Sequence, residues 1–155
     1  MYADQTHNHI IPLLAPVDTA GTAIQGDVFD AGECVSVEMQ VSFGVITGDT
    51  VAVTVEECDD IVPTNSTAIA FEYRKTSAVG TDSVGAVTAA TTSGVTMAAT
   101  DDGKILQIFV DPAALTAGYP YLRFVATPGG SASVCLLQGV ANVKPKKNPP
   151  GSMVD

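Results

Sequence analysis

The sequence has two histidines, His7 and His9, and they stand two positions apart. In an extended segment such residues share a face, so both imidazoles would point the same way and begin a metal site. A zinc site needs three or four ligands, and the nearest acids, Asp4 and Asp18, are not spaced as further ligands. We therefore predict an exposed polar segment here and no metal site.

Acidic residues gather in two short stretches, "EECDD" at 56–60 and "DDG" at 101–103. Calcium takes several oxygen ligands from a flexible loop, so both stretches are candidate cation sites. Neither has the alternating ligand spacing of a calcium-binding loop. The pattern favours a solvated acidic rim.

Nucleophilic catalysis has little support in the residues. A serine or cysteine nucleophile needs a base within hydrogen-bond reach, and both histidines lie near the start of the chain, with no GxSxG motif anywhere. The glycine-rich "TPGGSAS" at 127–133 lacks the lysine of a phosphate-binding loop. We predict no catalytic residue, no cofactor and no enzyme activity; a hydrolase with an unrecognised site is the enzymatic alternative.

Three cysteines, Cys34, Cys58 and Cys135, lie in apolar or strand-like surroundings without CxxC spacing. We expect them to be small buried hydrophobic residues. A bridge between Cys34 and Cys58 is conceivable, because they flank what the pattern predicts to be one hairpin.

The elements that would position any site are strands. Residues 34–46 and 50–58 alternate apolar and polar side chains around a "TGD" turn, with Val35, Val37 and Met39 on the apolar face. Valine, threonine, alanine and glycine dominate the chain, which has no tryptophan and 6% aromatic residues. Turn signals recur about every ten residues. The fold class predicted is all-β: an antiparallel β-sandwich, jelly-roll-like, with seven to nine short strands.

Three parts are expected along the 155 residues: an extended N-terminal arm at 1–32, a sandwich body at 33–143 and a basic, proline-rich C-terminal tail at 144–155. "GKILQIFVD" at 103–111 reads as a central strand. One short helix is expected near 111–117, from Asp111 as N-cap to the Gly118 terminator. Residues 76–100 fit either two short strands or a flexible loop.

Charge is unevenly distributed. Residues 1–143 hold sixteen acidic and four basic residues, whereas 144–155 hold three lysines and one aspartate. An acidic body repels phosphate backbones, so we expect no nucleic-acid partner. No apolar run is long enough to span a membrane, so no membrane partner is expected either.

A resemblance adds to this reading. The stretches "VSVEMQVSFGVITGDTVAVTVEEC", "AIAFEYRKTSA" and "GKILQIFVDPAALTAGYPYLRFVAT" resemble small structural proteins of tailed bacteriophages, over about residues 30–143. The resemblance implies a non-enzymatic virion protein of the capsid decoration (cement) type, often trimeric. Its partners would be the major capsid protein and neighbouring copies of itself. It would be made in the host bacterial cytoplasm and reside on the capsid surface.

The chain ends are the expected gripping segments, because both are proline-rich and flank a compact body. We predict that partner contacts involve these residues: His7, His9, Ile10, Ile11, Leu13, Leu14, Lys144, Lys146 and Lys147. Two other functions remain open: a tail- or spike-associated receptor-binding module, and a head–tail joining or tail-tube component. No small-molecule substrate is expected.

Overall fold

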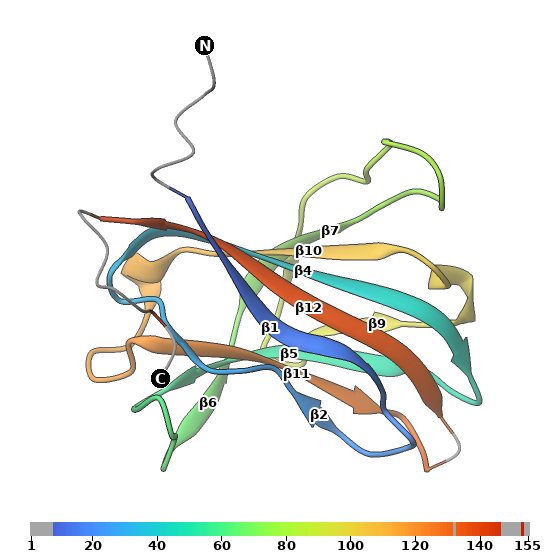
Figure 1. Cartoon of the computed structure of the whole chain (residues 1–155), viewed down its shortest axis with the longest axis horizontal. Helices are drawn as coiled ribbons and strands as arrows, with labels where there is room; N and C mark the ends of the chain where they lie inside the picture. Colours follow the sequence, from blue (N-terminus) through green and yellow to red (C-terminus); the bar gives the residue numbers. More distant parts are fainter. Residues whose placement is uncertain (1–7, 132, 147–152, 154–155) are drawn as a thin grey trace.

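The chain folds as two antiparallel sheets packed face to face (Figure 1). The computed structural model describes residues 8–131, 133–146 and 153. Within that part there are twelve strands and two 3₁₀ turns. Their bounds are β1 His9–Asp18, β2 Ile24–Gln25, β3 Phe29–Asp30, β4 Cys34–Thr47, β5 Val51–Cys58, β6 Ser66–Ile69, β7 Phe71–Lys75, β8 Thr88–Ala90, β9 Val95–Met97, η1 Ala99–Asp101, β10 Ile105–Val110, η2 Pro112–Ala114, β11 Tyr121–Pro128 and β12 Val134–Pro145.

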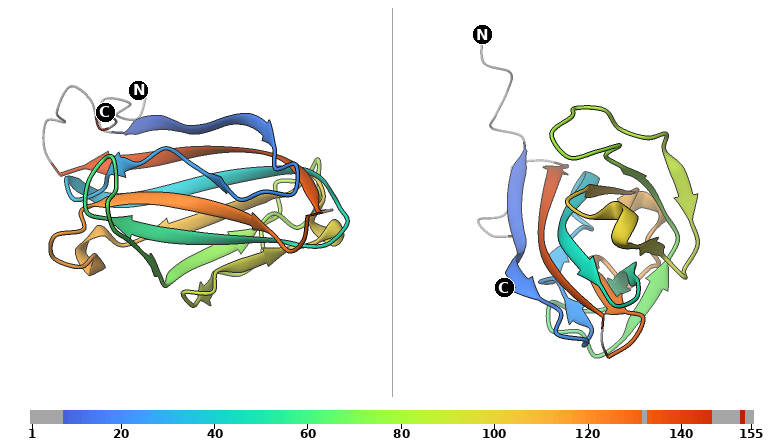
Figure 2. Two further views of the ribbon diagram at one scale, coloured as in Figure 1. Left: turned by 90° about the horizontal axis from the view of Figure 1, so that it is seen from below. Right: turned by 90° about the vertical axis from the view of Figure 1, so that its right-hand side faces the viewer.

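The first sheet, sheet A, has the order β1-β12-β4-β10-β7-β8. The second, sheet B, has the order β2-β11-β5-β6, with β3 beside β11 and β9 beside β5. The end-on view in Figure 2 shows the two layers and the curl of sheet A around the core. The predicted all-β antiparallel sandwich is confirmed. The strand number is higher than predicted, because β2, β3, β8 and β9 have only two or three residues, too few for an alternating pattern.

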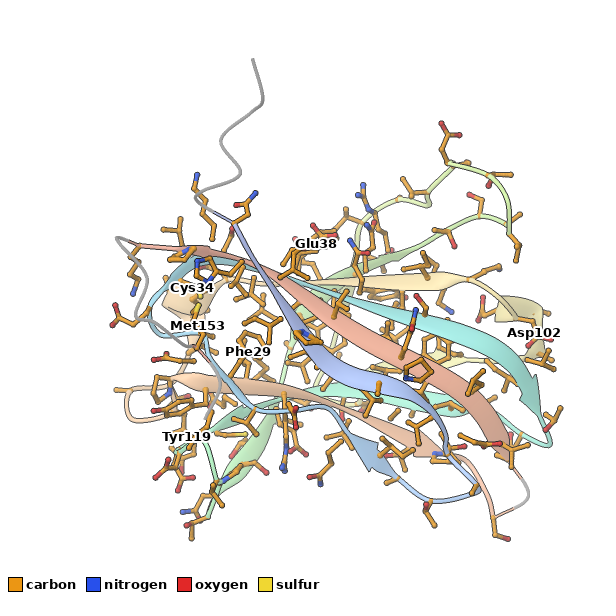
Figure 3. The ribbon with its side chains drawn as sticks, in the orientation of Figure 1. Phe29, Cys34, Glu38, Asp102, Tyr119 and Met153 are labelled. Atoms are coloured by element: carbon orange, nitrogen blue, oxygen red, sulfur yellow. The ribbon has the colours of Figure 1, made fainter. Side chains whose placement is uncertain are left out.

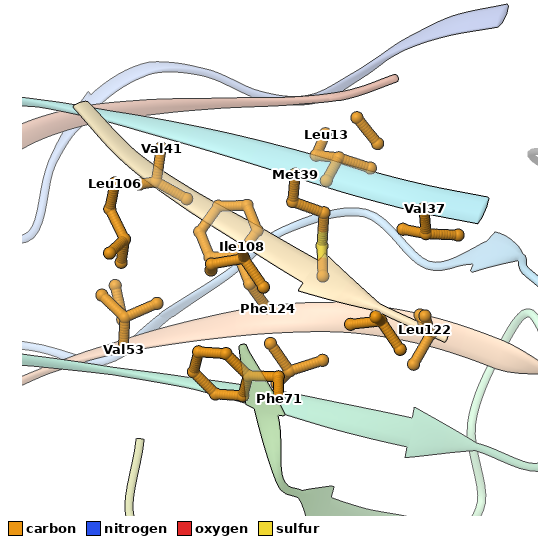
Figure 4. Packing of buried hydrophobic residues seen from close by; sticks show 14 of the residues in the cluster. Leu13, Val37, Met39, Val41, Val53, Phe71, Leu106, Ile108, Leu122 and Phe124 are labelled. Carbon is orange, nitrogen blue, oxygen red and sulfur yellow. The ribbon is translucent and has the colours of Figure 1, made fainter. Parts of the chain in front are cut away.

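The core lies between the sheets and follows the alternation in the sequence (Figure 4). Val37, Met39 and Val41 of β4 face Val53 and its neighbours on β5, all at most 2% exposed. Burying such a side chain contributes about 1.5–3 kcal/mol. β10 lies between β4 and β7, which confirms the central strand expected at 103–111.

The predicted hairpin at 34–58 is wrong in one respect. Both strands are present, but β4 pairs with β12 and β10 while β5 pairs with β11, β6 and β9. The turn at Gly48 therefore carries the chain from one sheet to the other. The reason is that both strands bury their apolar face in the same core, which places them opposite each other rather than side by side.

Register shifts also move two valines to the surface. Val35 was expected on the core face but is 55% exposed, because the β12–β4 register shifts between Lys144 and Pro145 and turns Cys34 inward instead. A second shift, between Cys135 and Leu137, leaves Val45 64% exposed. One extra residue in a strand reverses the faces of the residues beyond it.

The N-terminal arm expected at 1–32 joins the body from residue 9 onward. β1 pairs with β12 from His9–Val143 to Asp18–Leu136, and β2 and β3 pair with β11. The side chains of Ile11, Leu13 and Phe29 are at most 4% exposed. β1 is an edge strand, as its Pro12 and Pro16 favour.

The C-terminal tail also contacts the body where it is described. Lys144 and Pro145 end β12, and the Lys146 amide donates to the carbonyl of Glu33 at 2.8 Å. Met153 is 5% exposed, and its carbonyl accepts from the Asp30 amide at 2.9 Å. Figure 3 shows Met153 beside Phe29 and Cys34 at one end of the sandwich.

The structure defines the conformation of residues 76–100 and of the helix expected near 111–117. Residues 76–100 contain β8, β9 and the start of η1, which confirms short strands. The residues between β7 and β8 form a loop that projects from the sandwich (Figure 1). The helix expected near 111–117 is the shorter turn η2, with Asp111 accepting from the Ala113 amide at 2.9 Å and Pro112 at its first position.

Candidate functional site

An apolar groove opens at one end of the sandwich, where β7 separates from β10. The ladder between these strands ends at the pair Phe109–Glu72. Ala70, just before β7, connects β7 to the preceding strand β6, which belongs to sheet B. The groove has a volume of about 1070 Å³. Its lining comes from the start of β4, the β6–β7 crossing, the end of β8 with Thr92, and the end of β10 with η2: Val35, Ser36, Val37, Glu38, Ala68, Ile69, Ala70, Phe71, Glu72, Ala89, Ala90, Thr92, Phe109, Val110, Asp111, Ala114 and Leu115.

The turn η2 forms one wall of the groove. Its N-cap Asp111 and Pro112 stop β10 and direct the chain toward β11 in the other sheet. Leu115 packs against the core, and the Thr116 amide donates to Glu57 Oε2 at 2.9 Å. Glu57 is 5% exposed, so this hydrogen bond satisfies a buried carboxylate.

The charges on the lining are all negative: Glu38, Glu72 and Asp111. Glu38 accepts hydrogen bonds from Gln40 at 2.9 Å and from Gln107 at 3.1 Å. Glu72 and Asp111 are exposed. A groove with apolar walls and a carboxylate rim suits a ligand with apolar and positively charged groups.

The end of the sandwich opposite the groove holds a compact ion-pair cluster. Asp101 accepts from Lys75 at 2.8 Å and from Lys104 at 3.1 Å, and is 7% exposed. Burial raises the pKa of Asp101, but the two lysine hydrogen bonds outweigh it and lower that pKa below its ordinary value. Lys75 also donates to the Thr96 carbonyl at 3.0 Å, so the cluster joins β7 of sheet A to β9 of sheet B. Its geometry is that of a structural clamp.

The acids of 56–60 do not converge on one point. Glu56 pairs with Arg123 on β11 at 2.7 Å, while Glu57 is turned inward to Thr116. Asp59 holds its own loop, and the hydrogen bonds from the Asn65 amide and side chain lower the pKa of Asp59. Asp102, in the second stretch, accepts from the Ile46 amide at 2.8 Å. In residues 8–131, 133–146 and 153, no three His, Cys, Asp or Glu side chains come together as metal ligands.

The three cysteines are free and buried, as predicted. Burial raises the pKa of Cys34 to about 12, and the pKa values of Cys58 and Cys135 to about 11. Thiols with such pKa values are protonated near neutral pH, so they act as apolar packing groups.

The residues predicted to contact partners come from both ends of the chain, and the pairing of β1 with β12 places His9 opposite Val143, next to Lys144. His7 and Lys147 lie outside the described residues. On β1, Ile10 is 71% exposed and His9 is half-buried, whereas Ile11 and Leu13 are in the core and Leu14 packs against it. At the other chain end, Lys144 is exposed opposite Ser36, and the Lys146 ammonium donates to the Gly32 carbonyl at 2.5 Å.

The groove itself was missed at the sequence level. Its walls come from segments far apart in the chain, so no local spacing reveals it. The available signals were the small residues around Ala70 and the Asp111–Pro112 turn. They mark a sheet crossing, but they do not show that a groove forms there.

The described chain is thus an all-β protein, an antiparallel β-sandwich with an apolar groove at one end. No helix in the described part has the length and hydropathy that crossing a membrane requires.

No protein-family model matches the sequence, and neither does any curated protein. Two solved structures are similar to it, described as the structures of infectious bursal disease virus Gx strain and Gt strain. The first match has 12% identity and a TM-score of 0.28 over 94% of this chain and 47% of that chain. The second has 13% identity and a TM-score of 0.28 over 90% and 40%. The chain thus spans less than half of either matched chain.

Proposed function

We propose that this chain is a non-enzymatic structural protein of a bacteriophage particle that decorates and stabilises the capsid. It binds the major capsid protein and neighbouring copies of itself, as a homotrimer, on the capsid surface after synthesis in the host cytoplasm. The virion class comes from the resemblance of the stretches at 35–58, 68–78 and 103–127. A fold of two sheets around one continuous core is consistent with a structural protein.

One observation carries the proposal: large apolar side chains are exposed toward both ends of sheet A. Val45 on β4 and Leu136 on β12 lie at one end, Ile10 on β1 and Val35 on β4 lie toward the other, and all four are between 52% and 71% exposed. Leu136 lies against Gly44, directly beside Val45. Exposed apolar side chains that lie side by side on a rigid protein, as Leu136 and Val45 do, favour a protein-binding surface.

The particle itself provides the first test. Quantitative mass spectrometry of purified particles should find this chain in a copy number that matches the repeating units of the shell, and a map of the particle should place it on the head. A few copies at the tail or at one vertex would instead favour the receptor-binding or head–tail joining alternatives.

A matched pair of variants tests the surface. Leu136→Asp should lower occupancy on shells, because it places a charge among the apolar side chains of sheet A. Val62→Asp makes the same change on the β5–β6 loop, where Val62 is 79% exposed, and should leave occupancy unchanged. Equal occupancy of both variants would contradict a role for sheet A.

A further inference from the structure

We propose that the groove between β4, β7, β10 and η2 binds an extended peptide segment of another protein, in which apolar side chains lie next to lysine or arginine. This inference deepens the proposed function by naming the chemistry of the partner segment. It depends on the proposed function only for the source of that segment, which would be the shell.

The size and walls of the groove suit a polypeptide. Its volume of about 1070 Å³ lies just above the range of small-molecule pockets, ~300–1,000 Å³. Ala68, Ala70, Ala89 and Ala114 leave room above a floor that includes Phe71, which is 6% exposed. Small side chains over an apolar floor allow a bound chain to lie close and to seat its own apolar side chains.

The charge of the rim selects the partner. Three carboxylates and no lysine or arginine belong to the described lining. Arg74 is not part of the lining, but its guanidinium lies 5.5 Å from the centre of the ring of Phe109, a lining residue, and its Nε donates to Gln107 at 2.5 Å. Lys144, opposite Ser36 on β12, is not part of the lining. Three lining carboxylates against these two neighbouring bases leave an excess of negative charge, which a basic group on the partner would complement.

The same charge disfavours a second copy of this chain as the occupant. Residues 1–143 hold sixteen acidic and four basic residues, so a second copy would bring mostly acidic surface to an acidic groove. The exposed apolar loop between β7 and β8 carries Asp82 and no basic residue between Thr76 and Val87. The lysine-containing tail contacts its own body through Lys146 and Met153. A basic segment from a different chain fits better than either of these.

Three capped synthetic peptides test the inference on the full chain in solution: acetyl-KVAVPVK-amide and its analogues with glutamate or glutamine in place of both lysines. Amide NMR titrations at low salt should show the lysine peptide shifting signals from residues 69–72, 89–90 and 110–115. The glutamate peptide should bind at least about tenfold more weakly. No shifts with any peptide, equal binding of the lysine and glutamate peptides, or shifts confined to another surface would overturn the inference.

A charge-matched pair of variants sharpens the test. Glu72→Gln with Asp111→Asn removes two rim charges, and asparagine keeps the N-cap acceptor, so the fold should be retained. Binding of the lysine peptide should weaken about fivefold while the glutamine peptide is unaffected. Asp27→Asn with Asp82→Asn makes the same change at two exposed sites outside the groove and should alter nothing. Equal loss of binding in both double variants would reduce the effect to overall charge and contradict a groove-specific role.

Failure of these titrations leaves the copy-number result intact, because that experiment does not involve the groove. Conversely, if the chain binds the lysine peptide but is absent from particles, the peptide-binding role of the groove is supported and the capsid-decorating function is contradicted.

Discussion

Asp101 shows how single residues in this protein serve the fold rather than a reaction. Its carboxylate accepts hydrogen bonds from Lys75, Lys104 and the Ala98 amide. It lies at one end of the sandwich, where these bonds connect the two sheets. Glu57, turned inward at the other end, has a comparable role toward Thr116. Both acids lie in stretches that the sequence predicted to be a solvated rim.

Asp101→Asn should lower the free energy of unfolding by about 1–3 kcal/mol at neutral pH, because asparagine cannot pair with two lysines. The pKa of Asp101 is lowered in the folded chain, so its contribution is full above the unfolded value of about 3.9 and is lost as pH falls through the folded-state pKa. Urea unfolding measured across pH should therefore show the wild-type and variant curves converging in acid.

Asp82→Asn, at an exposed loop position, is the control and should follow the wild type at every pH. A gap between wild type and Asp101→Asn that persists unchanged below pH ~3 would mean that the charge of Asp101 does not stabilise the fold.

Glu57 illustrates what a pattern can and cannot predict at the residue scale. It continues the inward series Val51, Val53 and Val55, so alternation alone places it on the core face. Its partner, the Thr116 amide, is 59 residues away in sequence. No local signal contains that hydrogen bond, and so a buried acid was mistaken for a solvated one.

The packing of Phe124 joins the two sheets at the scale of elements. Its ring is fully buried on β11 of sheet B, and it fills the space above two glycines, Gly139 on β12 and Gly26 after β2. A Cβ added at either glycine would lie 2.5 Å from the ring atom Cε1. The glycines are therefore required by close approach.

Gly139→Ala should destabilise the protein by about 1–3 kcal/mol, because the enclosed ring must move. Phe124→Leu shortens the side chain and should relieve the clash, so the double variant should lose less stability than the two single losses together. Denaturant unfolding of the four proteins gives the coupling energy. Strict additivity would show that the ring does not limit position 139.

The strands were predictable from sequence, but their partners were not. Alternation identified both halves of 34–58, and the apolar run at 103–111 identified the central strand β10. The same alternation fits a hairpin and a pair of strands facing each other across a core, since both bury one face. The difference depends on β11 and β12, which lie far along the chain and supply the actual neighbours of β5 and β4.

At the scale of the whole molecule, the two edge strands of sheet A in the described part of the chain, β1 and β8, differ in length. β8 has three residues, whereas β1 has ten and would be the natural site for adding a strand. β1 contains Pro12 and Pro16. A proline on an edge strand occupies a position where the backbone N–H would face the open side, so the edge has no donor there. Edge pairing through β1 is thereby discouraged, and the acidic charge of the molecule adds to this effect.

Pro12→Val should restore a donor to the open edge of β1 and increase self-association. Light scattering and size-exclusion chromatography over a concentration series should show larger species than for the wild type, more so at high salt, where repulsion is screened. Ala15→Val enlarges an exposed side chain on the same strand without adding a donor, and should remain like the wild type. Association that is equal in both variants would attribute the effect to hydrophobicity alone.

The pairing of β1 with β12 also affects how the protein folds while it is being translated. β12, its neighbour in sheet A, is the last of the twelve described strands along the chain, so β1 waits for this partner until more than a hundred further residues have left the ribosome. At ~5–20 residues per second, that wait is on the order of ten seconds. During it the apolar side of β1 stays exposed, and a chaperone that shields nascent chains should raise the yield more for this protein than for one whose first strand pairs with its sequence neighbour.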